Sequence, residues 1–181
     1  MQPIIIGTNR SKLTVAIVSS LVFATLGIVL IIAPFISTNL NSFAKSFMIF
    51  GGVLAVGLFG FSVIYNSRKL SDPAPALIVD VNGITDNGSG VGAGFIPWTD
   101  ITNVSTIAVL STQYMIIIVN NPQFYIERQK NWMKQKAMHA NFKLHGSPIT
   151  ISNISMNVTF DQLNAAIMQG AQHHFNSKNA N

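Results

Sequence analysis

The sequence predicts an α+β membrane protein, in which a transmembrane helical hairpin precedes one folded domain with an antiparallel sheet closed by a C-terminal helix. Two apolar runs, 13–35 and 47–65, carry no charged residue. At about 1.5 Å per residue, each run is long enough to cross a hydrocarbon core of roughly 30 Å as a helix. The short linker 36–46 between them leaves no room for a domain, and the strand and turn signals that predict the folded domain come after residue 75.

The first apolar run is longer than the roughly 7–15 apolar residues of a signal-peptide core. No small-x-small cleavage pattern follows it, so we expect it to be retained. The predicted organisation is an N-terminal segment 1–12, a hairpin 13–65, a linker 66–75, a domain 76–175 and a flexible tail 176–181. The β-branched run 3–6 lies before the hairpin, and we expect it to return as a short strand that pairs with the domain.

Basic residues near the ends of the apolar runs predict the orientation. Arg10 and Lys12 precede the first run, Arg68 and Lys69 follow the second, and the connection carries only Lys45. Because basic residues favour the cytoplasmic side, both termini are expected in the cytoplasm. The formal charge of +5 makes an anionic lipid surface the expected electrostatic partner. No nucleic-acid motif is present, so no nucleic acid is expected as a partner.

Small residues recur at helix-packing intervals in both apolar runs. Ala16, Ser20 and Ala24 lie four apart in the first run, and Gly51 and Ala55 in the second. Small residues at this spacing let helix backbones approach closely in lipid. The two spans can pack against each other within one chain, or one stripe can also build a homo-oligomer.

The first half of the domain reads as an antiparallel meander. Short β-rich segments alternate with turn signals, of which the Asn-Gly pair at 82–83 is the strongest. The expected strands are 76–81, 83–86, 92–96, 101–110 and 114–119, with residues 111–113 linking the last two.

A helical insert and a closing helix follow. Pro122 suits the first turn of a helix, and helix-compatible residues dominate 124–144. A short strand is expected at 149–152. Thr159 and Gln162 form a capping box for a final helix that ends near residue 175. The expected inward faces are Met133, Ala137, Ala140 and Leu144 for the insert, and Phe160, Leu163, Ile167 and Ala171 for the last helix.

The stretch GFIPWTDI at 94–101 resembles the I-P-W-x-D-I segment of bacterial membrane-anchored pleckstrin-homology-like (PH-like) proteins. With NPQFYIER at 121–128 and LHGSPITI at 144–151, the whole chain is similar to an uncharacterised bacterial family of small proteins with two transmembrane helices and a PH-like domain. The resemblance implies the order of a short strand, a helix hairpin, strands, a helical insert, a strand and a final helix. It also implies the bacterial inner membrane, and it bears on architecture much more than on biochemical activity.

The residues themselves favour a protein that is not an enzyme and carries no cofactor or metal. Cysteine is absent, and six acidic residues lie scattered along the chain. Asp100 has no catalytic partner in the sequence, and the four histidines lack the spacing of a zinc helix. The glycine-rich segment 88–94 lacks the lysine and the following helix of a phosphate loop, so it is expected to be a hairpin.

A basic cluster with one tryptophan is the one group of residues in the sequence that suggests a function. Its candidate contact residues for a membrane surface or a partner are Arg68, Lys69, Arg128, Lys130, Trp132, Lys134 and Lys136. Trp and Lys together suit a membrane interface, although a solvated helix face or a protein-docking surface would have the same composition. The expected function is a membrane-anchored, non-enzymatic binding or scaffold module. The alternative is an immunity-type protein that neutralises a membrane-acting toxin by direct binding.

Overall fold

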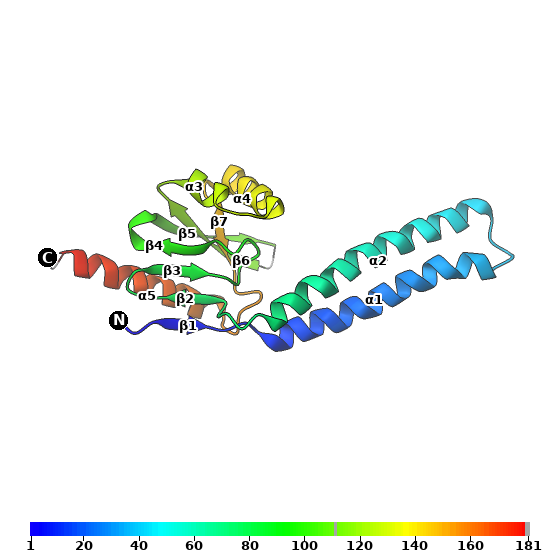
Figure 1. Ribbon diagram of the computed structural model, residues 1–181, viewed down its shortest axis with the longest axis horizontal. Helices are drawn as coiled ribbons and strands as arrows, with labels where there is room; N and C mark the ends of the chain where they lie inside the picture. Colours follow the sequence, from blue (N-terminus) through cyan, green and yellow to red (C-terminus); the bar gives the residue numbers. More distant parts are fainter. Residues whose placement is uncertain (111, 180–181) are drawn as a thin grey trace. The chain divides into compact units, whose positions relative to one another are not determined.

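The computed structural model describes residues 1–110 and 112–179, with the side chains of 177–179 left aside (Figure 1). The chain is α+β and divides into two compact units. A helical unit comprises Arg10–Pro73, and a folded domain combines Met1–Asn9 with Ala74–Asn181.

The helical unit contains two long helices, α1 (Arg10–Ile36) and α2 (Ser42–Ser71). Both are longer than the apolar runs, and the expected linker 36–46 shrinks to residues 37–41. Asn41 caps α2 by accepting a 2.8 Å hydrogen bond from the amide of Ala44, which moves the start of this helix ahead of residue 47. Pro73, two residues after Ser71, prevents the helix from continuing.

A close seam joins the two helices. The buried residues of α1 recur every seven positions: Leu13, Ser20, Gly27 and Pro34. Opposite them, a Cβ at Gly52 would lie 2.6 Å from the carbonyl oxygen of Gly27, so the backbones meet where neither residue has a side chain. The rings of Phe23 and Phe59 stack with centroids 4.9 Å apart. The expectation that the spans pack on each other is confirmed.

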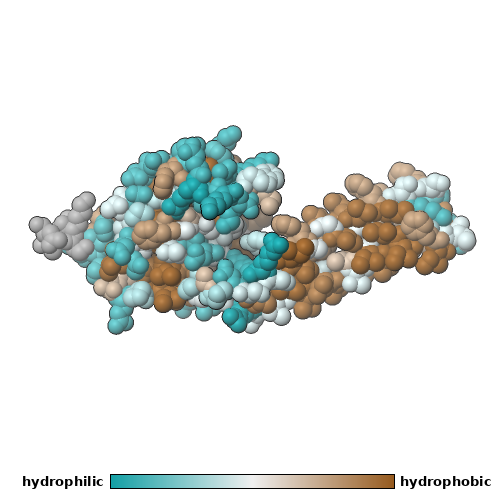
Figure 2. Space-filling model, viewed as in Figure 1, coloured by the Kyte–Doolittle hydropathy of each residue, from teal (hydrophilic) through white to brown (hydrophobic). Residues whose placement is uncertain are grey.

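The rest of the helical surface is apolar. Large side chains such as Phe35, Phe43, Phe47 and Phe50 are exposed, and brown hydrophobic residues cover most of this unit in Figure 2. Two helices of this length and apolarity are consistent with a membrane protein. A side chain at Gly51, Gly57 or Gly60 would meet nothing within 4 Å, so these glycines take no part in the seam.

A four-stranded antiparallel sheet begins the folded domain. Its order is β1 (Ile4–Ile6), β2 (Leu77–Val79), β3 (Gly83–Asp86) and β4 (Gly94–Pro97). The expected N-terminal strand is confirmed, because Ile5 of β1 lies opposite Ile78 of β2. The residues after β1 are also bound to the domain, since the amide of Asn9 donates to the carbonyl of Ser155 at 2.8 Å.

The turn between β2 and β3 forms where the Asn-Gly pair predicts it, but for another reason. Gly83 does not have a positive φ. Instead, the Asp80 carboxylate accepts hydrogen bonds from the amides of Asn82 (2.7 Å) and Gly83 (3.1 Å). A Cβ at Gly83 would lie 2.2 Å from the carbonyl oxygen of Ile96, so glycine is needed there for the close approach of β4.

A second antiparallel sheet contains β5 (Ile101–Val109), β6 (Thr112–Val119) and β7 (Ile149–Ile151), in that order. The expectation of one continuous meander is wrong here, because β4 and β5 belong to different sheets. A 3-10 turn, η1 (Trp98–Asp100), separates them and redirects the chain. Residue 111 of the expected 111–113 connection lies outside the described residues.

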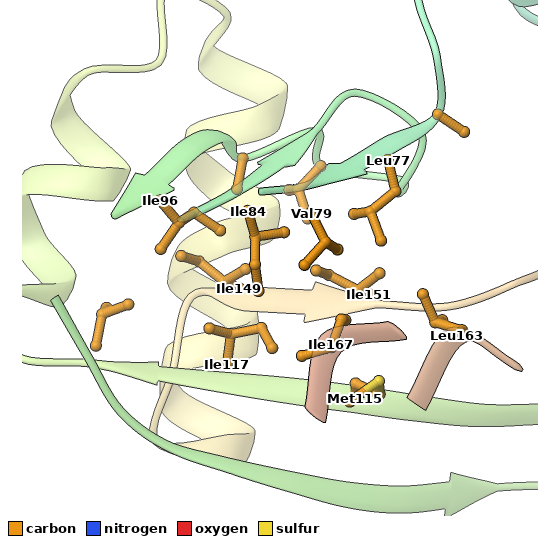
Figure 3. Close-up of a cluster of buried hydrophobic side chains, with 14 of the residues drawn as sticks. Leu77, Val79, Ile84, Ile96, Met115, Ile117, Ile149, Ile151, Leu163 and Ile167 are labelled. Carbon is orange, nitrogen blue, oxygen red and sulfur yellow. The ribbon is translucent and has the colours of Figure 1, made fainter. Parts of the chain in front are cut away.

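The core lies between the two sheets and is closed by α5 (Phe160–Asn179). Figure 3 shows Leu163 and Ile167 of α5 among side chains of both sheets, including Ile84 and Ile117. The capping box is confirmed: Gln162 Oε1 accepts from the Thr159 amide, and Thr159 Oγ1 accepts from the Gln162 amide, at 2.9 and 3.2 Å. The helix runs past its expected end at 175, and residues 180–181 of the expected tail lie outside the described part of the chain.

The helical insert between β6 and β7 is two helices instead of one, α3 (Pro122–Glu127) and α4 (Trp132–His145). Pro122 occupies the first turn of α3 as expected. Asn121 caps α3 and Asn131 caps α4, so the sequence contains a second helix start that the periodicity of 124–144 conceals.

Candidate functional site

The basic insert, residues 122–145, is built around Arg128 at the joint between α3 and α4. The Arg128 guanidinium donates to the carbonyl oxygens of Ala93 and of Phe95, the latter at 2.8 Å. Its carbon lies 4.3 Å from the ring centroid of Tyr125, which is a cation–π distance. Burial lowers the pKa of Arg128. Arg128 therefore links α3 to β4, and its guanidinium already has hydrogen-bond and cation–π partners within the domain.

A second polar contact joins the insert to η1. The Tyr125 hydroxyl donates a 2.6 Å hydrogen bond to the Asp100 carboxylate. Burial first, and then this bond, raises the pKa of Tyr125 well above its ordinary value. Asp100 is thus explained by a structural partner that no sequence spacing reveals.

The inner face of α4 centres on Met138, which is fully buried. Polar side chains on either side of it are paired with backbone and hydroxyl groups. Gln135 donates to the carbonyl of Gln129 at 2.8 Å, and Asn141 donates to the hydroxyl of Thr150 in β7 at 3.1 Å. The first bond lies within the insert, and the second joins the Met138 side of α4 to β7.

The face expected to point inward is the outer one. Met133 and Leu144 are 49% and 75% exposed, and Ala137 and Ala140 are exposed as well. The expectation was wrong because α4 has apolar residues on two sides. The side that carries Met138 packs into the core instead, and Asn141 on that side donates to Thr150 of β7.

The candidate basic residues separate into different environments. Lys136 is exposed on the outer side of α4, Lys130 is exposed before it, and Trp132 is 67% exposed at its start. Lys134 lies on another side, with its Nζ 3.2 Å from the position that a Cβ would take at Gly92. Arg68 and Lys69 end α2 in the helical unit. The structure therefore places two of the seven candidates, Trp132 and Lys136, on the exposed outer side of α4.

Lys143 belongs to the same surface and was not among the candidate residues. It follows Lys136 by seven positions, which places the two on the same side of α4, and it is exposed. The heptad spacing is visible in the sequence, but only the inward position of Met138 shows that this side faces outward.

The glycine-rich loop after β3 encloses the buried carboxylate of Asp86. The amides of Gly88, Ser89 and Ala93 donate to it at 3.2, 2.9 and 3.0 Å, and the Ser89 hydroxyl donates as well. Because these amides point inward, they are not presented to a phosphate. The prediction of a structural glycine-rich hairpin agrees with this arrangement.

A small groove lies between the start of β5 and the C-terminal half of α5. It has a volume of about 190 Å³ and is lined by apolar residues that include Trp98, Ile101, Val104, Met168 and Phe175. Its volume is below the roughly 300–1,000 Å³ of common small-molecule pockets. Residues from separate elements build it, so no local sequence pattern predicts it.

Within the described residues, no three His, Asp or Glu side chains lie close enough together to hold a metal ion. The insert, with its exposed basic and apolar residues, remains the surface with the clearest chemistry. A comparison of the chain with protein-family models, curated proteins and solved structures finds no match.

Proposed function

We propose that this protein is a membrane-anchored, non-enzymatic binding module, held by its helical hairpin at the cytoplasmic face of a bacterial inner membrane. The observation that carries the proposal is the connection of the two units. β1 precedes α1, β2 follows α2, and the two strands are neighbours in one sheet. The hairpin is therefore an insertion between adjacent strands, with two covalent connections to the domain.

The exposure of the hairpin supports an anchor. A core helix of a soluble protein buries its apolar side chains. In the most apolar 18-residue stretches of α1 and α2, only 11% and 6% of the residues are buried. Polar groups in the hairpin find partners inside it: Ser20 and Ser62 share a 2.8 Å hydrogen bond, and Asn66 donates to the carbonyl of Ser62. Internal pairing of this kind is what a hydrocarbon environment requires.

The arrangement of the domain supports a PH-like architecture. A four-stranded and a three-stranded antiparallel sheet enclose one core, and a C-terminal helix covers it. In this proposal, α3 and α4 are an addition between the last two strands. We assign no reaction to the protein, because the polar groups of Asp86, Asp100 and Arg128 are engaged in structural contacts.

The orientation can be tested with single cysteines, because the natural chain has none. In intact cells, a membrane-impermeant maleimide should label Asn39→Cys in the α1–α2 connection after the outer membrane is made permeable. Gln2→Cys before β1 and Val81→Cys after β2 should react only when the inner membrane is opened. Labelling of Gln2 and Val81 in intact cells would reverse the orientation, and labelling of all three would contradict the anchor.

The binding role can be tested by replacing Trp132 with a photo-crosslinking amino acid in the full chain within native membranes. The proposal expects lipid adducts or adducts with one recurrent protein, identified by mass spectrometry. Val81 is a matched control, since its side chain is also exposed but lies in the turn between β2 and β3. Equal, unselective adducts at both positions would contradict a binding surface on the insert.

A further inference from the structure

We propose that the outer face of α4 is an interfacial membrane-binding helix, whose apolar row enters the headgroup region of an anionic bilayer. This inference rests on the proposed function, since a membrane anchor supplies the bilayer. It goes further by naming anionic lipid as the partner and α4 as the binding element.

Two adjacent rows run along this face. The apolar row is Met133, Ala137, Ala140 and Leu144, spaced as i, i+4, i+7 and i+11. The basic row contains Lys136, His139 and Lys143, with Trp132 at its start. Lys136 follows Met133 by three positions, and Lys143 follows Ala140 by three, so each lysine is a surface neighbour of the apolar row.

The exposure of the apolar row is what needs an explanation. Leu144 is 75% exposed although Met138, on the opposite side of the same helix, is fully buried. Met138 lies in the core and Asn141 donates to Thr150 of β7, so the opposite side of α4 packs on the domain and the row faces outward. A helix with an apolar row, basic neighbours and a tryptophan is the pattern of helices that lie in the membrane interface.

Charge complementarity selects a bilayer of anionic lipid as the occupant. Between Glu127 and Asp161 the chain has no acidic residue, while this segment contains Arg128, Lys130, Lys134, Lys136 and Lys143. Two of these residues point elsewhere, Arg128 toward β4 and Lys134 toward Gly92. Lys130 lies before α4, in its connection to α3, and Lys136 and Lys143 remain beside the apolar row. There they attract lipid phosphate while the row enters the interface.

The test uses the full chain in lipid nanodiscs, with a nitroxide attached to a cysteine at Ala140→Cys. Discs of phosphatidylcholine alone are compared with discs that also contain phosphatidylglycerol. In the anionic discs, the nitroxide should become more accessible to oxygen, which dissolves in lipid, and less accessible to a water-soluble nickel complex. The same label at Val81→Cys should stay water-accessible in both discs.

The double variant Lys136→Gln, Lys143→Gln checks the role of charge. Each lysine near an anionic surface changes the partition of the helix by roughly fivefold, so together they should lower the ratio of membrane-bound to unbound α4 by roughly thirtyfold. Lys134→Gln is the matched control and should leave the ratio within about twofold. Circular dichroism shows whether each variant remains folded.

A label at Leu54→Cys, on the exposed side of α2, separates this inference from the proposed function. A lipid-exposed label at residue 54 with a water-exposed label at 140 in anionic discs would overturn the inference and leave the anchor intact. A water-exposed label at 54 would overturn both. Equal insertion of residue 140 in both kinds of disc, or no effect of the double variant, would overturn the requirement for anionic lipid.

Discussion

At the scale of single residues, several positions are decided by backbones or rings that approach from distant parts of the chain. Gly170 lies in the middle of α5, where alanine would ordinarily favour the helix by about 1 kcal/mol. A Cβ there would lie 2.5 Å from the Trp98 ring and 2.5 Å from Cγ1 of Val79. Both neighbours are buried.

Gly170→Ala should therefore destabilise the domain. The overlap costs about 1–3 kcal/mol against a gain of about 1 kcal/mol in helix propensity, so the free energy of unfolding should fall by up to about 2 kcal/mol. Denaturant unfolding of the purified full chain, followed by near-UV circular dichroism, measures the change. Gly90→Ala is the control, because a Cβ at Gly90 meets nothing within 4 Å; an equal loss in both variants would contradict the packing argument.

Tyr125 gives a residue-scale prediction on pH. Tyr125→Phe removes the hydrogen bond to Asp100 and should cost about 1–2 kcal/mol at neutral pH. Because the folded state raises the pKa of Tyr125 above its ordinary value of about 10, this stabilisation is fully present below about pH 10 and is lost as the pH rises further. The stability gap between the natural chain and the variant should narrow in that range. A gap that stays constant from pH 8 to about pH 11 would contradict it.

At the scale of elements, α4 shows that apolar periodicity alone can predict the wrong buried face of a helix. Met138→Ala should lower the free energy of unfolding by about 2–5 kcal/mol, since the side chain is fully buried and its removal leaves a cavity. Leu144→Ala should change it by less than about 0.5 kcal/mol, because that side chain is 75% exposed. Thermal unfolding of both variants measures the difference. The opposite order would restore the face that the sequence alone predicts.

At the scale of the whole molecule, the pairing of β1 with β2 makes the N-terminal segment part of the domain. Deletion of residues 2–6 removes β1, so the amides of β2 that face it lose their partners. Hydrogen exchange of Leu77–Val79 should then speed up, while exchange in β6 changes much less. The measurement uses the full chain in detergent, and unchanged protection of β2 would show that β1 contributes little to the sheet.

Local signals in the sequence were sufficient for much of this protein. Hydrophobicity and the absence of charge located the two long helices, because a long uncharged apolar run is a property of the chain itself. The Thr159–Gln162 capping box and Pro122 at the start of α3 are also local, since they depend on groups a few residues apart. These features gave the α+β class and the position of the basic insert.

Only the tertiary structure decided which contacts those elements make. It divided the strands at Trp98–Asp100 into two sheets, turned Met138 inward, directed Arg128 to β4 and Tyr125 to Asp100, and gathered Trp132, Lys136 and Lys143 outside. The contacts of Tyr125 and Arg128 join residues 25 and 33 positions apart in the sequence. α4 has apolar residues on two sides, and the side that packs inward carries Met138 in the core and Asn141 bonded to Thr150 of β7, partners that meet it only when the chain folds.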